Sequence, residues 1–138
     1  MDKTQITRAE IKEVKELVDD WREAVTSMSE DESDFEVDNY RFILKCDIDE
    51  VMTDELSSDT YTLGCFNAHF IADIIGLSCE VIEKAQESES FELLGELMIK
   101  DIEEVQSAYV SSEGYGHHFG HYDCNEIELT DYYVFRIN

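Results

Sequence analysis

The chain has 138 residues, of which 34 are Asp or Glu and 10 are Lys or Arg, so its formal net charge is −24. This length predicts one domain over residues 1–138, and a hydrophobic fraction of 43% with 11% aromatic residues is too high for a disordered acidic tail. The charge disfavours direct binding to nucleic acid or membrane, and the start of the chain lacks a signal-like apolar stretch, so we expect a cytoplasmic protein.

The first predicted element is a helix over residues 8–28. Thr7 and Glu10 have the spacing of a capping box, and apolar residues then recur at helical spacing. Their stripe is Ile11, Val14, Leu17, Val18, Trp21, Val25 and Met28. After a polar run, the aromatic and β-branched segment 40–44 predicts a strand, and residues 48–56 predict a short acidic helix.

Three further helices are predicted in the centre of the chain. One runs from residue 59 or 60 to Gly76, whose freedom at positive φ suits a helix end. Ser78 is a predicted N-cap for the next helix. A long helix follows from about residue 90 and ends at Gly114, and Gly95 within it is interpreted as a point of close helix packing.

After Gly114 the sequence is aromatic, alternating and interrupted by turn residues. This pattern predicts a C-terminal β-meander, to which residues 40–44 could add a strand. The predicted fold is therefore α+β, with four to five helices packed on a small C-terminal antiparallel sheet. In this arrangement residues 1–113 are helical and residues 114–138 are β-rich.

Residues 66–87 resemble a helix-turn-helix. Ala72, Gly76 and Ile82 occupy the small, turn and packing positions of such a corner. The second helix would present three carboxylates and one ammonium to DNA, namely Glu80, Glu83, Glu87 and Lys84. Phosphates would be repelled, so the resemblance implies the corner geometry and not DNA binding.

One segment is dense in metal-ligand residue types. Its candidate ligands are His117, His118, His121, Asp123 and Cys124. An extended strand would place His117 and His121 roughly 13 Å apart and would turn His118 to the other face, so we expect no bound zinc unless a loop gathers the ligands. All the cysteines are expected to be reduced and mostly buried, and they are Cys46, Cys65, Cys79 and Cys124.

The sequence contains no catalytic signature such as a nucleophile elbow, a phosphate-binding glycine loop or a His-Glu-x-x-His helix. With 34 carboxylates, a close pair of acids carries no weight as an acid–base argument. We therefore expect no enzyme activity and no cofactor.

The acidity begins after the first predicted helix. Residues 1–22 hold six acids and five bases, whereas the other 116 residues hold 28 acids and five bases and so carry −23. The whole chain has the charge of about 41 Å of duplex DNA, while a compact domain of this length is ~35 to 40 Å across. Acidity that serves only solubility or a salty cytosol is the alternative explanation.

A small, acidic chain of this kind resembles the counter-defence proteins of phages and plasmids, the anti-CRISPR and anti-restriction inhibitors that imitate nucleic acid. The resemblance rests on size and composition. It implies that the partner is a basic nucleic-acid-binding protein of the host and that carboxylates of this chain block the groove of that protein. It does not decide whether the chain forms oligomers. The predicted partner-binding residues are Asp31, Glu32, Asp34, Asp47, Glu50, Asp54, Glu80, Glu83, Glu87, Glu92 and Glu96.

The alternative function is a small metal-binding or regulatory interaction module. It would use the helix-turn-helix-like corner 66–87 and the His117–Cys124 segment.

Overall fold

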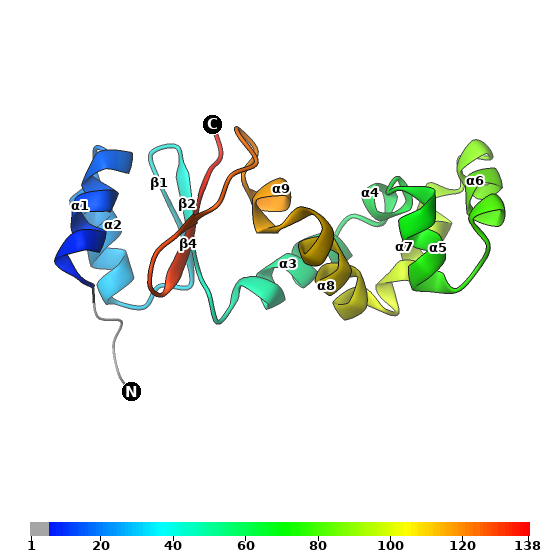
Figure 1. Ribbon diagram of the computed structural model, residues 1–138, viewed down its shortest axis with the longest axis horizontal. Coiled ribbons are helices and arrows are strands. Elements are labelled where there is room, and N and C mark those ends of the chain that lie inside the picture. The colour runs from blue at the N-terminus through cyan, green and yellow to red at the C-terminus, as the bar shows by residue number, and fades with distance from the viewer. Residues whose placement is uncertain (1–5) are drawn as a thin grey trace. The chain divides into compact units, whose positions relative to one another are not determined.

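A computed structural model describes residues 6–138 and shows an α+β protein, as predicted (Figure 1). Within these residues it has nine helices and one four-stranded antiparallel sheet. The predicted four to five helices were too few, and the sheet is not purely C-terminal. The chain divides into two compact units, which we call the first unit (the chain up to Ile48, with Glu113–Asn138) and the second unit (Asp49–Ser112).

The first unit holds three helices and the sheet. Its elements are α1 (Arg8–Leu17), α2 (Trp21–Ser29), β1 (Asp34–Val37), β2 (Tyr40–Leu44), α9 (Tyr115–Phe119), β3 (Ile127–Glu128) and β4 (Tyr132–Arg136). The strand order is β1-β2-β4-β3, so half of the sheet comes from the N-terminal part of the chain. The predicted strand 40–44 is confirmed, and it pairs with β4 in a register that sets Phe42 opposite Val134.

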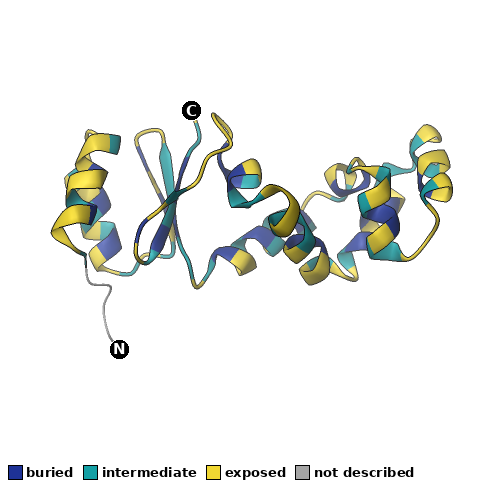
Figure 2. Ribbon diagram, in the orientation of Figure 1, coloured by how far each residue is buried: buried dark blue, intermediate teal, exposed yellow. Residues whose placement is uncertain are grey.

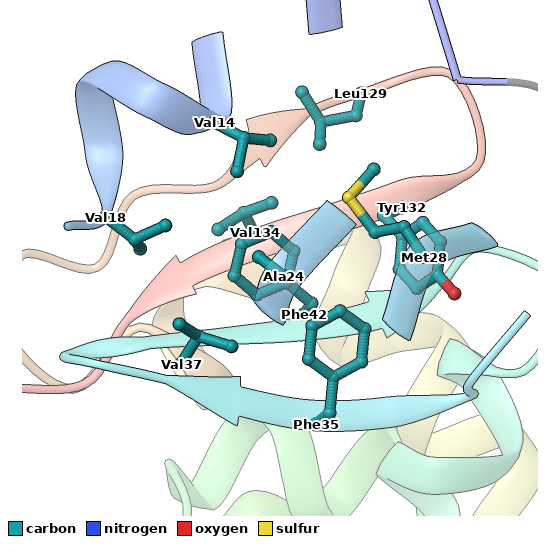
Figure 3. Packing of buried hydrophobic residues seen from close by; sticks show 10 residues of the cluster. All are labelled: Val14, Val18, Ala24, Met28, Phe35, Val37, Phe42, Leu129, Tyr132 and Val134. Atoms are coloured by element: carbon teal, nitrogen blue, oxygen red, sulfur yellow. The ribbon is translucent and has the colours of Figure 1, made fainter. Parts of the chain in front are cut away.

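Side chains of alternate residues cover the two faces of this sheet. On one face, Phe42 and Val134 belong to a buried cluster with Val14 of α1 and Met28 of α2, and Phe35 of β1 stacks on Phe42 at 4.8 Å (Figure 3). Strand alternation turns the neighbouring residues of β2 and β4 to the opposite face. Helices α1 and α2 therefore cover one face of the sheet.

The opposite face is covered by the short helix α9. Phe119 of α9 is fully buried and lies 5.1 Å from Phe135 of β4 between ring centroids. The guanidinium of Arg41 lies over the same Phe119 ring at 5.1 Å. Sequence alternation assigned the His-rich segment to a strand, but part of this segment is helical. Burial of Phe119 against the sheet outweighs the β-like, aromatic composition of the segment.

The predicted helix over residues 8–28 is two helices. Val18 ends α1 in an extended conformation (φ −127°, ψ 139°), and Asp20 is the N-cap residue of α2. Both helices bury their apolar stripes in the same cluster, so the stripe continues across the break. Periodicity therefore cannot detect this break, and the only local signal is the pair Asp19–Asp20, a residue type that favours turns and caps.

The capping box at the start of α1 also ties this helix to the sheet. Thr7 accepts a hydrogen bond from the Glu10 backbone at 3.1 Å, as predicted. The Glu10 carboxylate, only 7% exposed, accepts hydrogen bonds from the Thr130 hydroxyl at 2.8 Å and the Thr130 backbone at 3.2 Å. A cap residue thus fixes the turn between β3 and β4 against α1.

The second unit is helical. Its elements are α3 (Ile48–Ser57), α4 (Thr60–Gly64), α5 (Ala68–Ile75), α6 (Cys79–Glu87), α7 (Phe91–Ile99) and α8 (Ile102–Glu113). The predicted helix from residue 59 or 60 to Gly76 is split by a cap at Asn67, whose side chain accepts from the His69 backbone at 2.8 Å. The predicted long helix from residue 90 is split at Lys100 and Asp101, and its end at Gly114 (φ 79°) is confirmed.

Helices α4 and α7 approach closely enough to exclude side chains at two positions. A Cβ atom on Gly95 would overlap the carbonyl oxygen of Thr60, and one on Gly64 would overlap the carbonyl oxygen of Phe91. Each glycine therefore admits the backbone of the other helix. The interpretation of Gly95 as a site of close packing is confirmed.

We predict that Gly95→Ala destabilises the protein by at least about 2 kcal/mol, because a fixed carbonyl occupies the space of the new methyl group. In a solvent-exposed helix the same change would stabilise by up to about 1 kcal/mol. Urea unfolding measures the difference, with Ser107→Ala at an exposed position of α8 as control. A Gly95→Ala protein as stable as the wild type would show that the two backbones are not in contact.

Candidate functional site

The second unit concentrates uncompensated acid. Residues 49–112 contain 15 acids and two bases, a net charge of −13, whereas the first unit has 19 acids and eight bases. Fourteen of those 15 carboxylate residues are exposed, and α6 is largely exposed along its length (Figure 2). Lys84 pairs with Glu80 at 3.4 Å, but both side chains are more than two thirds exposed, so solvent weakens this bridge.

Four of the predicted partner-binding acids lie in the first unit, and three of them take part in local structure. Asp34 holds Arg41 through two hydrogen bonds, at 2.8 Å from Nε and 2.6 Å from Nη2. Asp47 accepts from the Ser33 hydroxyl at 2.8 Å and is half-buried. Asp31 is half-buried at a positive φ of 55°, and Glu32 is exposed.

The other seven predicted acids lie in the second unit and are all exposed. They come from three helices: Glu50 and Asp54 from α3, Glu80, Glu83 and Glu87 from α6, and Glu92 and Glu96 from α7. Their charges are therefore available to a partner.

Acids from α3 and α8 meet at one pocket. It has a volume of about 510 Å³ and is lined by Asp49, Glu50 and Glu103, together with Thr53 and Gln106. The Gln106 amide fixes one wall by donating to Asp49 at 2.8 Å. Sequence periodicity cannot show that Asp49 and Glu103 meet, because only the fold brings these helices together.

Helix α6 is held by caps and by one long side chain. Gly76 ends α5 in the left-handed conformation (φ 83°), and Ser78 caps α6 by accepting from the Val81 backbone at 3.3 Å, both as predicted. Gln86 donates to the carbonyls of Gly64 at 3.0 Å and Phe66 at 2.8 Å, which lie at the end of α4. In the corner predicted over residues 66–87, these contacts thus hold α6 against the end of α4.

Two groups of the second unit have shifted pKa values. The Thr62 hydroxyl (2.6 Å) and backbone (3.1 Å) donate to Asp59 at the start of α4 and lower the pKa of this carboxyl. Partial desolvation and the nearby Glu83 raise the pKa of the Cys79 thiol. Cys79 is therefore protonated near neutral pH and a weak nucleophile.

We predict that Asp59→Ala lowers stability at neutral pH and that this loss shrinks in acid. The stabilisation by a carboxyl with a lowered folded-state pKa is present above its unfolded pKa and is lost as the pH falls through the folded pKa. Thermal melts of both proteins over a pH series measure this, with exposed Asp73→Ala of α5 as control. A stability difference independent of pH would show that the charge of Asp59 does not contribute.

The histidine segment lies in the first unit. His117 and His118 belong to α9, and His121 and Cys124 follow it in an exposed connection. The His118 ring packs edge-on against Phe119 at 4.6 Å. Across residues 6–138, no group of three or more His, Cys, Asp or Glu side chains is arranged to hold a metal ion.

The cysteines are free thiols, but the expectation that they are mostly buried is wrong. Cys46, Cys65 and Cys124 are exposed and Cys79 is half-buried. The three exposed residues lie in connections between elements, where no apolar face covers them.

The chain matches no protein-family model, and neither the curated proteins nor the solved structures include a match to it. Among residues 6–138, no helix has both the length and the apolar composition needed to cross a membrane.

We predict that protein purified without a His tag contains no stoichiometric zinc by elemental analysis. The helical turn of α9 points His117 and His118 in different directions, since successive residues of a helix lie about 100° apart. A stoichiometric zinc signal that His118→Ala or Cys124→Ala abolishes would contradict this and favour the metal-module function.

Proposed function

We propose that the protein is a non-catalytic inhibitor that competes with DNA or RNA for the basic groove of a host defence enzyme of the CRISPR-Cas or restriction type. One observation carries this proposal: the second unit exposes 14 carboxylate residues and contains only two bases. The proposal makes the partner a basic protein and places the inhibitor in the cytoplasm, where such enzymes meet nucleic acid.

The charge density of the second unit supports imitation of nucleic acid. Its −13 equals the charge of about 22 Å of duplex DNA. A compact chain of 64 residues is roughly 28 Å across. The unit is therefore nearly as charged as a DNA segment of its own size, and it would be steered toward a Lys/Arg-lined groove.

Solubility alone is a weaker explanation. Charge that serves only solubility need not be concentrated in one part of the chain. The ratio of bases to acids nevertheless differs between the units, with eight bases to 19 acids in the first and two bases to 15 acids in the second. Self-repulsion within so acidic a unit disfavours the compact state. An interaction that uses the charge accounts for the asymmetry.

The metal-binding or regulatory module has less support. The corner 66–87 lies in the second unit and the His117–Cys124 segment in the first, so no single compact unit contains both. The corner by itself remains compatible with a role in binding a protein.

We predict that the protein inhibits DNA cleavage by at least one enzyme in a panel of purified restriction endonucleases and CRISPR effector complexes. Replacing Glu80, Glu83 and Glu87 by Gln should weaken inhibition about tenfold, since three salt bridges of roughly 0.5 kcal/mol each are lost. Rising salt should also relieve inhibition, because exposed charges are screened beyond about 8 Å at physiological ionic strength.

The matched control changes the net charge equally on the first unit, by Glu13→Gln, Glu16→Gln and Asp19→Asn, all at exposed positions. It should inhibit like the wild type. Equal weakening by both triple variants would show that only net charge matters. Retardation of duplex DNA by the protein itself in a gel-shift titration would contradict the competition mechanism.

A further inference from the structure

The pocket between α3 and α8 is lined by a nearly buried amide that has an open acceptor. Gln106 is only 6% exposed. Its amide nitrogen donates to Asp49 Oδ1 at 2.8 Å and to the Met52 sulfur at 3.7 Å, so both of its hydrogens are used. Of residues 6–138, none donates a hydrogen bond to its carbonyl oxygen, Oε1.

This oxygen opens into the pocket. In the described part of the chain, every side-chain oxygen that is sealed from solvent has a hydrogen-bond partner. Because Oε1 has none, it is accessible, and Gln106 lines a pocket of about 510 Å³. The bond to the Asp49 carboxylate, an acceptor, identifies the amide nitrogen and so fixes which end of the amide faces the open space.

The other lining side chains also offer acceptors and no spare donor. Asp49 and Glu50 of α3 and Glu103 of α8 contribute three carboxylates. The Thr53 hydroxyl donates to the Glu50 backbone carbonyl at 2.9 Å, which leaves its oxygen as an acceptor. No Lys, Arg or His is among the residues that line the pocket. A ligand that fits this lining is therefore a cation with several donors.

A guanidinium group meets these conditions better than a metal ion or an ammonium group. Across residues 6–138, no group of three or more ligand-type side chains is arranged to hold a metal ion. A guanidinium is a planar fork of N–H donors that can bind a carboxylate through two hydrogen bonds at once. It is also more weakly hydrated than an ammonium, so it loses less on leaving water.

We infer that the α3–α8 pocket is a binding site for a guanidinium group, held by the carboxylates of Asp49, Glu50 and Glu103 and by Gln106 Oε1. The volume lies within the range of ligand pockets, roughly 300 to 1,000 Å³. The group can come from an Arg side chain of a protein or from a small molecule. This site goes beyond the proposed function, because it binds guanidinium whether or not the protein inhibits an enzyme.

NMR titration of the ¹⁵N-labelled full chain with methylguanidinium chloride tests the site at constant ionic strength. The signals of the Gln106 side-chain amide are identified by their loss in Gln106→Met. They should shift on titration, whereas the Gln86 amide, which donates to the carbonyls of Gly64 and Phe66 and does not line the pocket, should not. Methylammonium chloride should bind about threefold more weakly or worse, since it has fewer donors.

Glu103→Gln and Glu104→Gln form a matched pair. Both residues are exposed on α8 and both changes remove one negative charge, but only Glu103 lines the pocket. Glu103→Gln should weaken methylguanidinium binding about threefold, and Glu104→Gln should leave it unchanged. Gln106→Met removes the open acceptor and should weaken binding about tenfold, with thermal melts showing that each variant is folded.

Two further probes distinguish the sources of the group. Agmatine is a small guanidinium compound, and a blocked Gly-Arg-Gly peptide carries the same group on a protein backbone. Binding of the peptide assigns a protein arginine as a source, and binding of agmatine alone assigns a small molecule. An unshifted Gln106 amide with every guanidinium probe, equal weakening by Glu103→Gln and Glu104→Gln, or equal affinity for methylammonium would overturn the inference.

Discussion

The direct contact of two helix backbones holds the second unit together. Gly64 of α4 and Gly95 of α7 each admit a carbonyl of the other helix, and any side chain at either position would force the helices apart. Gln86 then links α6 to the end of α4 through two hydrogen bonds. The Gly64–Gly95 contact thus fixes α4 against α7, and Gln86 fixes α6, which carries Glu80, Glu83 and Glu87, against α4. This close packing offsets the self-repulsion of a unit with a charge of −13.

Both units expose many acids, and they differ mainly in how many bases accompany those acids. In the first unit, Asp34 is paired with Arg41, and Glu10 joins α1 to Thr130 through hydrogen bonds. In the second unit nearly every acid is exposed and only two bases are present. Paired and hydrogen-bonded acids stabilise the fold, whereas the uncompensated charge of the second unit opposes its compact state.

Signals that lie within a few residues of each other were sufficient to predict several local features. The Thr7 capping box, the left-handed Gly76 and the Ser78 cap are all present, because their chemistry is local. The helix break at Val18 and the helix around Phe119 were missed, since both depend on burial against strands distant in sequence. The exposure of the acid rows was predictable, because helical periodicity is a local property. The meeting of α3 and α8 at one pocket was not predictable, because it depends on how distant helices pack.

The central claim is that the exposed acids of the second unit form the contact with a basic partner. Carboxyl footprinting by carbodiimide labelling and mass spectrometry tests it directly, with the protein free and bound to an enzyme that it inhibits. The account predicts that labelling of Glu80, Glu83 and Glu87 falls on binding, while labelling of Glu13 and Glu16 on α1 is unchanged. Protection confined to the first unit, or unchanged labelling of α6 in a complex that excludes DNA, would contradict it.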